Sequence, residues 1–167
     1  KVFVPTTYYK EEATNTANKE SYSYYFDGTN WVKSLENHNS IPFASGGITS
    51  TTADLTKFIY ALFDGKLVSP TSLEQMKEIK EGYGKALIQF PFGERRFYGH
   101  GGRIENFSSM LGYYPTEKLS FSLISNGDNF VQNDIIIGIL SIYYKMPFPF
   151  PKFMKMDKAE LAKFTGT

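Results

Sequence analysis

His100 lies in the setting best suited to chemistry in this sequence. It closes a short apolar run, Phe97–Gly99, and is followed by Gly101 and Gly102. Glycines beside a polar side chain at the end of a strand leave backbone N–H groups and the imidazole open to a ligand, because no Cβ obstructs the approach. The stretch therefore predicts a substrate-binding or catalytic role for His100. A structural histidine in a glycine-rich turn is the alternative.

The remaining polar residues exclude several kinds of chemistry. His38 stands in a run of Asn and Ser that is typical of a solvated loop, and two histidines in unlike contexts predict no metal site. The sequence has no cysteine, which excludes disulfides, thiol catalysis and Cys-ligated zinc. Arg103 has two equal interpretations, a contact with a substrate carboxylate and an ordinary surface position. No cofactor is expected.

Composition indicates one globular domain of 167 residues with a real core. The net charge of +1 predicts no nucleic-acid partner, and the longest apolar run, Ile135–Leu140, is far shorter than the roughly 20 residues that span a bilayer. The 12 Tyr and 15 Phe exceed ordinary usage. Such a surplus needs a large core, a binding groove or a missing neighbour to cover it. Lys1 in place of Met suggests a chain cut from a longer one.

Two helices are expected ahead of the histidine. Thr51 followed by Asp54 resembles a capping box, and Gly65 is a natural stop. Between them, apolar residues recur at helical spacing and define one buried face: Leu55, Phe58, Ile59, Leu62 and Phe63. Ser69–Pro70 predicts the start of the second helix, as an N-cap followed by a proline in the first turn. Leu73, Met76 and Ile79 are its expected apolar face.

Beyond Tyr83 the apolar period becomes two, which predicts an antiparallel sheet of about four strands and an α+β fold. The expected strands are 86–90, 95–98, 107–114 and 119–126, with turns at 91–94 and 115–118. Residues 131–144 predict a helix apolar nearly all round, buried on more than one side.

Three smaller elements complete the expected order. Ser21–Phe26 and Trp31–Val32 predict a hairpin around Asp27-Gly28, whose aromatics line a cleft or pack as an ordinary strand. Pro147, Pro149 and Pro151 predict an extended connector, and residues 157–164 a short amphipathic helix.

Five segments resemble, in order, the serine β-lactamase-like family, which groups class C β-lactamases, D-Ala-D-Ala carboxypeptidases and related esterases. The resemblance covers residues 40–145, and its order makes it far more specific than any one motif. The matching segments are Gly46–Phe58, Asp64–Pro70, Tyr83–Gly84 with Tyr98–Gly102, Phe107–Ser109, and Ser125–Asn126.

The resemblance implies a cleft lined by three motifs, of which this sequence holds one. His100-Gly101-Gly102 matches the family's Lys/His-x-Gly triad. By resemblance, His100 helps to bind the substrate carboxylate and assists proton transfer, and the backbone N–H of Arg103 is one oxyanion-hole donor. Ser-x-x-Lys and Tyr-x-Asn are absent; the nearest strings to the former are 7–10 and 16–19, both in polar, loop-like sequence.

Because the absent motifs lie N-terminal to everything matched, the sequence resembles a C-terminal portion. Residues 1–150 are expected to be the C-terminal part of a β-lactamase-like domain. Residues 151–167 are expected to lead toward a further β-domain, whose start Ala159–Leu161 and Thr165–Thr167 resemble.

The resemblance implies a serine hydrolase that acts on amide or ester bonds through an acyl-enzyme, with its nucleophile outside this chain, so that the fragment alone is inactive. A related esterase and a non-catalytic peptidoglycan- or peptide-binding module are the alternatives. The expected partners are a peptide-like or β-lactam substrate, and either the missing N-terminal half or a swapped copy of the chain. The expected location is the periplasm, the cell envelope or the outside of the cell.

Overall fold

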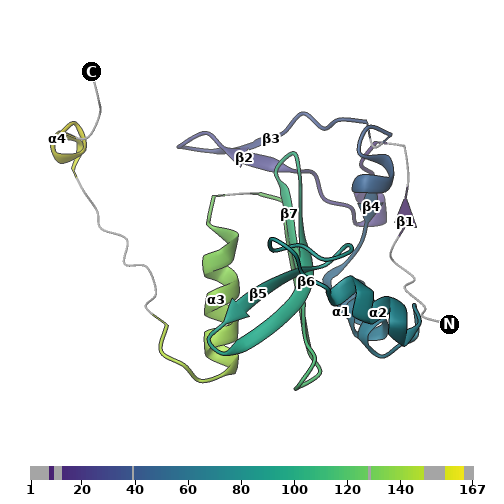
Figure 1. The fold of residues 1–167 in the computed structure, drawn as a ribbon. Helices are drawn as coiled ribbons and strands as arrows, with labels where there is room; N and C mark the ends of the chain where they lie inside the picture. Colours follow the sequence, from purple (N-terminus) through teal and green to yellow (C-terminus); the bar gives the residue numbers. More distant parts are fainter. Residues whose placement is uncertain (1–7, 10–12, 39, 128, 149–156, 164–167) are drawn as a thin grey trace.

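The computed structural model describes residues 8–9, 13–38, 40–127, 129–148 and 157–163, and it shows an α+β fold built on one antiparallel sheet (Figure 1). Neighbouring strands of the sheet are also neighbours in sequence, as expected for a meander joined by short turns. They are β5 (Ile88–Phe92), β6 (Arg95–Ile104), β7 (Phe107–Tyr114) and β8 (Leu119–Ser125). The predicted fold class is confirmed.

The first hairpin of the sheet differs from its prediction at both ends. Pro91 and Phe92 stay in β5, where Pro91 pairs with Arg96, and the turn shrinks to Gly93 and Glu94. An edge strand tolerates proline because one side of its backbone needs no ladder partner, and Gly93 accepts the positive φ of 57° that the tight turn requires. The predicted end of β6 at residue 98 is also wrong, since the strand continues to residue 104.

Helices cover both faces of this sheet. α1 (Thr52–Phe63) and α2 (Pro70–Lys77) lie on one face, and α3 (Gln132–Tyr143) lies on the other (Figure 1). The α1 face buries a cluster of Ile59, Leu62, Leu73, Leu87 and Tyr113. The α3 face buries Phe92, Phe97, Met110, Ile136 and Leu140. Since strand side chains alternate between faces, β6 contributes Phe97 to the second cluster while Tyr98 packs against the first.

Local signals at the helix ends act as predicted. The Thr51 hydroxyl accepts a hydrogen bond from the Asp54 N–H at 3.2 Å, and Gly65 follows α1 with a φ of 72°. Ser69 caps α2, and Pro70 is its first residue. The predicted apolar stripe of α1 is buried at Ile59 and Leu62, but Phe58 remains 43% exposed, and Ile79 lies beyond the end of α2. Polar contacts also join α1 to the sheet, since the Ser122 hydroxyl donates to the Thr52 carbonyl oxygen at 2.7 Å.

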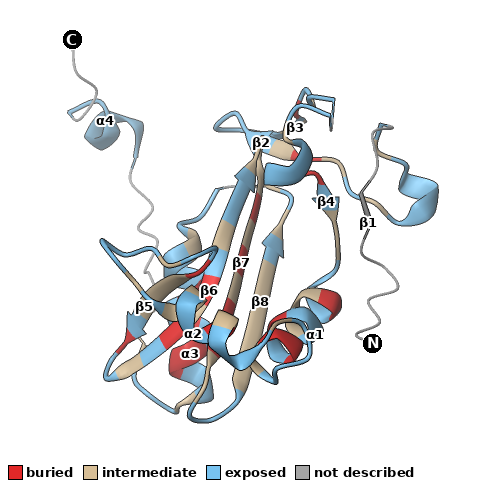
Figure 2. Cartoon of the chain, turned by 45° about the vertical axis from the view of Figure 1, so that its right-hand side comes forward, coloured by how far each residue is buried: buried red, intermediate tan, exposed pale blue. Residues whose placement is uncertain are grey.

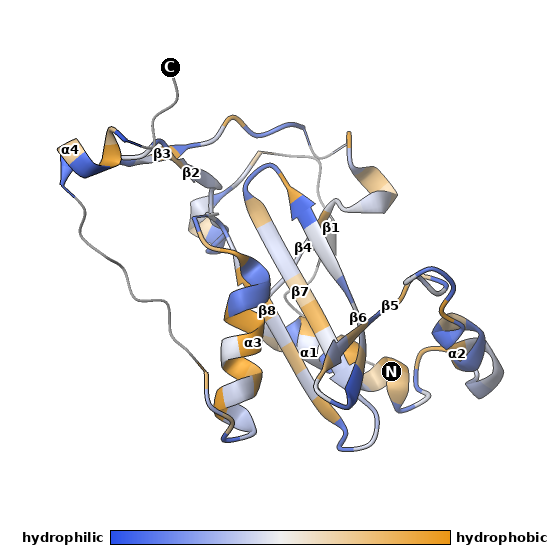
Figure 3. Ribbon diagram, turned by 60° about the vertical axis from the view of Figure 1, so that its left-hand side comes forward, coloured by the Kyte–Doolittle hydropathy of each residue, from blue (hydrophilic) through white to orange (hydrophobic). Residues whose placement is uncertain are grey.

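Much of α3 stays exposed in the described structure, although its sequence predicts burial on more than one side. Ile136 and Leu140 pack into the cluster on the sheet, and Gly138 lies close to the ring of Phe148. Several other apolar side chains of the helix have no such cover within the described residues. The apolar side chains left between 36% and 65% exposed are Ile135, Ile137, Ile139, Ile142 and Tyr143. Figure 3 shows much of the α3 ribbon in the colour of hydrophobic residues.

Two glycines opposite each other make the centre of the sheet possible. Gly99 of β6 pairs with Gly112 of β7, and the rings of Phe90 and Phe121 meet over this spot with centroids 6.1 Å apart. A Cβ at Gly112 would come within 2.6 Å of the Phe121 ring, and a Cβ at Gly99 would overlap the Leu111 carbonyl oxygen. The absent side chains therefore let aromatic rings from the two outer strands touch across the two inner ones.

A smaller hairpin of β2 (Tyr24–Phe26) and β3 (Trp31–Lys33) joins the end of β8, as the backbone N–H of Tyr24 donates to the Asn126 carbonyl oxygen at 2.8 Å. The hairpin was predicted, although its first strand is shorter than the expected run. Hydrogen bonds from the backbone N–H groups of Asn30 and Thr29 lower the pKa of the Asp27 carboxyl in its turn. The remaining described elements are β1 (Tyr8–Tyr9), η1 (Thr16–Asn18), η2 (Phe43–Ser45), β4 (Ile48–Thr49) and α4 (Lys158–Leu161).

The helix α4 begins after Asp157, as expected, and ends at Leu161, before the predicted end. The connector at Pro149 and Pro151, and the segment Thr165–Thr167, lie outside the described residues. Figure 2 shows burial concentrated on the sheet and the helix faces turned toward it. In the described part of the chain, no helix has the length and apolar character needed to cross a bilayer.

Candidate active site

The predicted site residues lie on an open stretch of strand edge. β5 pairs with β6 only as far as Gly99, which lies opposite Ile88, whereas β7 accompanies β6 to Ile104. Among the described strands, residues 100–104 of β6 therefore have a neighbour on one side only. His100, Gly101, Gly102 and Arg103 all fall in this stretch. An open strand edge offers N–H and C=O groups to an extended ligand.

The position of His100 corrects the expectation that it ends a strand. It lies at the middle of β6, opposite Leu111, and its side chain is exposed. The backbone does not end there because glycine, although it weakens a strand, does not terminate one that is paired with a long neighbour. The pairing between β5 and β6 ends just before His100. The edge of β6 is therefore unpaired from the residue at which the sequence predicted the end of the strand.

The ring of His100 has a defined neighbourhood. Its Nδ1 lies 2.5 Å from the Gly101 carbonyl oxygen, and the Tyr83 ring stands edge-on to it with centroids 6.5 Å apart. Because a carbonyl oxygen only accepts hydrogen bonds, Nδ1 is the protonated nitrogen of this contact. In the neutral ring, Nε2 then carries the lone pair and can accept a proton or a hydrogen bond.

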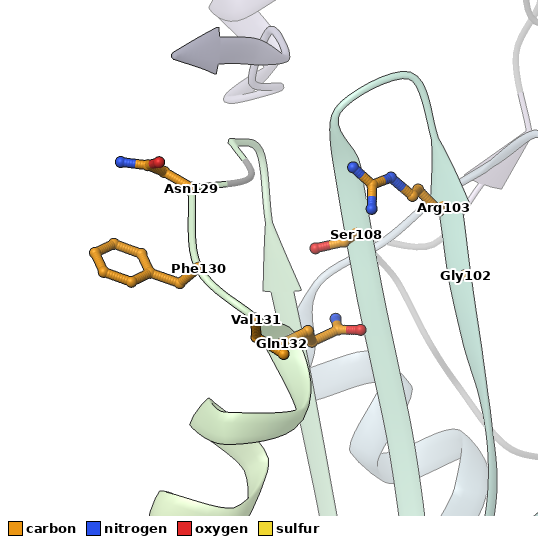
Figure 4. Close-up of a pocket in the computed structure, with 7 residues that line it drawn as sticks. All are labelled: Gly102, Arg103, Ser108, Asn129, Phe130, Val131 and Gln132. Carbon is orange, nitrogen blue, oxygen red and sulfur yellow. The ribbon is translucent and has the colours of Figure 1, made fainter. Parts of the chain in front are cut away.

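Arg103 projects to the other side of the sheet from His100. Side chains three positions apart on a strand point to opposite faces, and Arg103 pairs with Ser108 of β7 beside the start of α3. There the structure has an open hollow of about 510 Å³. It is lined by Gly102, Arg103, Ser108, Asn129, Phe130, Val131 and Gln132 (Figure 4). Figure 4 shows Arg103 and Gln132 entering it from two sides, with the Ser108 hydroxyl between them.

The glycines of the site leave different amounts of room. A Cβ at Gly102 would lie 2.8 Å from the Ser109 hydroxyl oxygen, whereas one at Gly101 would stay 3.4 Å from the Met110 sulfur. The strand therefore accepts a side chain at residue 101 more readily than at residue 102. Within the described residues, no three His, Cys, Asp or Glu side chains are grouped in a way that could hold a metal ion.

Sequence reasoning missed most of the residues that line the hollow. Ser108 was used only as part of a predicted strand and of a motif, Asn129 and Phe130 were given no role, and Val131 was only the first residue of the predicted helix. Gln132 gave no signal, because its role depends on which strand the helix start meets. The one signal in the sequence was the short connection between the last predicted strand and the apolar helix. It indicates a place where a helix N-terminus lies beside the sheet.

The fold and site place the chain in a known class. The family model described as Beta-lactamase matches residues 4–139, which is most of the sequence. The chain therefore belongs to the β-lactamase family, and the resemblance stated from its motifs is confirmed. That family includes serine hydrolases.

Solved structures with the same fold include enzymes and a penicillin-binding protein homologue. The D-amino acid amidase from Ochrobactrum anthropi, complexed with L-phenylalanine amide, has a TM-score of 0.71 and 22% identity over 85% of this chain and 47% of its own. The octameric penicillin-binding protein homologue from Pyrococcus abyssi has a TM-score of 0.68 and 21% identity, over 86% of this chain and 35% of its own. A D-stereospecific amidohydrolase from Streptomyces has a TM-score of 0.58 and 25% identity, over 65% and 35%.

The chain spans about half the length of the amidase and about a third of the other two structures. At these identities the likeness shows the fold. No curated protein matches the chain in sequence.

Proposed function

We propose that this chain forms the sheet side of the active site of a serine hydrolase that cleaves amide or ester bonds through an acyl-enzyme. The open edge of β6 at residues 100–104, with His100 on it, is the observation that carries the proposal. The nucleophilic serine belongs to residues outside this sequence, since the sequence contains no Ser-x-x-Lys. The substrate is peptide-like or a β-lactam, and this chain alone does not turn it over.

In this proposal the substrate lies along the free edge of β6 in an extended conformation. Strand-like pairing would hold its backbone, and the Arg103 N–H would donate to the oxyanion as the serine attacks the carbonyl carbon. A backbone N–H on a sheet strand needs no reorganisation when the negative charge forms. The serine oxygen forms the acyl bond, the amine or alcohol leaves with a proton, and water later releases the acid.

His100 fits the proton-handling part of this scheme. Its Nδ1 contact with the Gly101 carbonyl oxygen leaves Nε2 directed away from the strand backbone. An imidazole placed there could pass a proton between the attacking oxygen and the leaving group. The same group can also hydrogen-bond an anionic substrate when it is charged.

The partner and location follow from the same proposal. The exposed apolar side chains of α3 require cover, and the remainder of the family domain, or a swapped copy of this chain, would supply it. Serine hydrolases of this type act on peptidoglycan-like or β-lactam substrates, which places the protein in the periplasm, the cell envelope or outside the cell. The amidase and amidohydrolase among the similar structures favour an amide substrate over an ester.

Labelling of the longest natural form of the protein with a fluorescent penicillin tests the proposal. The label should map by peptide mass spectrometry to a serine outside this sequence, and His100→Ala should slow labelling by about 10²-fold or more. His38→Ala is the matched control, because its ring is exposed and hydrogen-bonds Ser40 in the adjacent loop. A parent without any reactive serine, tested also with D-amino acid amides and esters, would contradict the enzyme proposal and favour a binding module.

A further inference from the structure

Tyr83 is an exposed aromatic residue whose backbone is held in place from two directions. Its side chain is 65% exposed, so the ring adds little to the core. The Tyr83 N–H donates to the Lys80 carbonyl oxygen at 3.0 Å, and the Tyr83 carbonyl oxygen accepts from the Lys80 N–H at 2.7 Å. Tyr83 also forms an antiparallel β-bridge with Ile88, the first residue of β5. The fold therefore fixes the position of a ring that it does not bury.

The turn that carries Tyr83 uses backbone conformations that residues other than glycine rarely adopt. Its central residues, Glu81 and Gly82, have φ of 52° and 90°, which is the pattern of a type I′ turn, and Ala86 has φ of 61°. The Lys85 N–H donates to the Met76 carbonyl oxygen of α2 at 3.2 Å, which fixes the far side of the turn. Strained backbone persists only where the surrounding structure enforces it, and it is concentrated at functional sites.

This turn places the Tyr83 ring against His100. The centroids of the two rings lie 6.5 Å apart with an angle of 61° between the planes, an edge-on arrangement. The second contact of the imidazole is that of Nδ1 with the Gly101 carbonyl oxygen. A side chain on an open strand edge has several staggered rotamers available, and these two contacts favour one of them. An edge-on aromatic pair is strong enough to change the ratio of two ring orientations about two- to tenfold.

We propose that Tyr83 is a positioning residue for His100. Its ring limits rotation of the imidazole, so that Nδ1 stays on the Gly101 carbonyl oxygen and Nε2 stays available to a substrate at the open edge of β6. Tyr83 needs no contact with the substrate for this role. The inference rests on the proposed function for its catalytic meaning, but the ring orientation can be measured whether or not a nucleophile is present.

Nitrogen-15 spectra of the histidine rings in this 167-residue chain test the orientation directly. Recorded where the rings are neutral, they distinguish the tautomer protonated at Nδ1 from the one protonated at Nε2. In the unsubstituted chain His100 should be mainly protonated at Nδ1, because a carbonyl oxygen only accepts hydrogen bonds. Tyr83→Ala should lower the ratio of the Nδ1-protonated to the Nε2-protonated ring about two- to tenfold, whereas Tyr83→Phe, which keeps an aromatic ring, should preserve it.

Tyr143→Ala is the matched control, because Tyr143 is 57% exposed and lies at the end of α3. It should leave the His100 tautomer ratio unchanged. The His38 ring, which hydrogen-bonds Ser40, is an internal reference in every spectrum. The inference would be overturned by a His100 ring mainly protonated at Nε2 in the unsubstituted chain, by an unchanged ratio in Tyr83→Ala, or by an equal change in Tyr143→Ala or Tyr83→Phe.

The longest natural form of the protein gives a second readout. There Tyr83→Ala should slow the acylation step of penicillin labelling about two- to tenfold and leave the affinity for penicillin unchanged. A loss confined to affinity would make Tyr83 a substrate-binding residue and would overturn the positioning role. Because the ring spectra need no nucleophile, a protein that takes up no label would contradict the proposed function and leave the tautomer result standing.

Discussion

The two faces of the sheet are completed to different degrees. On the α1 face, two helices close over Ile59, Leu73 and Tyr113, and the Ser122 hydroxyl fastens the start of α1 to β8. On the other face a single helix packs on the sheet through Ile136 and Leu140, and several of its other apolar side chains remain at least 36% exposed. The α1 face therefore has its partners within this chain, whereas the α3 face is built to be covered further. The hollow lined by Arg103, Ser108 and Gln132 lies on that second, less complete face.

Removing the most buried ring tests whether the α3 face has a true core despite its exposed helix. Phe97 is fully buried and contacts the rings of Phe90, Tyr114 and Phe121 at centroid distances of 5.3–5.8 Å. Phe97→Ala should lower the free energy of unfolding by about 3–5 kcal/mol, because it leaves a large cavity. Urea unfolding followed by circular dichroism measures this.

The control for that variant is Tyr83→Ala, whose ring is 65% exposed. It should change stability by less than about 0.5 kcal/mol. A loss below about 1 kcal/mol for Phe97→Ala would mean that the α3 face is loosely packed. The two faces would then differ in the packing of their buried side chains as well as in the exposure of their helices.

The end of α3 is attached to the sheet by a group that titrates at high pH. The Tyr144 hydroxyl donates to Glu117 at 2.8 Å, and the guanidinium of Arg95 lies 3.7 Å from the centre of the Tyr144 ring. Burial, followed by the hydrogen bond to Glu117, raises the pKa of Tyr144 from 10.0 to about 12. The folded chain therefore holds this proton more tightly than the unfolded chain does.

The contribution of Tyr144 to the free energy of unfolding should be fully present below pH 10. It should fall as the pH rises from 10 to about 12. The effect is modest, because Tyr144 is only partly buried. Thermal unfolding measured across this range should show the fall in the parent chain and in Tyr143→Phe, and a flatter profile in Tyr144→Phe. The same slope in all three proteins would show that Tyr144 does not hold α3 in place.

Features set by residues close together in sequence were predicted better than features set by contacts between distant segments. Thr51, Gly65 and Ser69–Pro70 act on neighbours a few residues away, so both ends of α1 and the start of α2 were correctly predicted from sequence. The full length of β6 was missed, because the need for Gly99 comes from the Leu111 backbone on another strand. A hydropathy pattern can identify α3 as apolar all round, but it cannot say which partner covers each side.

The residues of the candidate site show the same difference between local and long-range features. The sequence singled out His100 through the glycines around it and the family motifs, and the structure places it on β6 just beyond the end of the pairing with β5. Ser108 and Gln132 are 24 positions apart and meet only because β7 and the start of α3 lie together. The pattern of residue types along one segment cannot predict which distant segment will lie beside it. The burial of the Gln132 Nε2 without a hydrogen-bond partner among the described residues is likewise visible only in the coordinates.

The smallest effect on stability is expected where the two sides of α3 are compared directly. Ile142 is 65% exposed and Ile136 is 6% exposed, so one helix offers the same residue type on both sides. Ile142→Asn should change the free energy of unfolding of this chain by about 0.5 kcal/mol or less, whereas Ile136→Ala should cost about 2–5 kcal/mol. If the outer side is an interface, Ile142→Asn should also reduce self-association in sedimentation velocity or weaken binding of the remaining family domain. A large loss of stability in the monomeric Ile142→Asn chain would show instead that this side is already covered within the chain, and the contrast between the two faces would disappear.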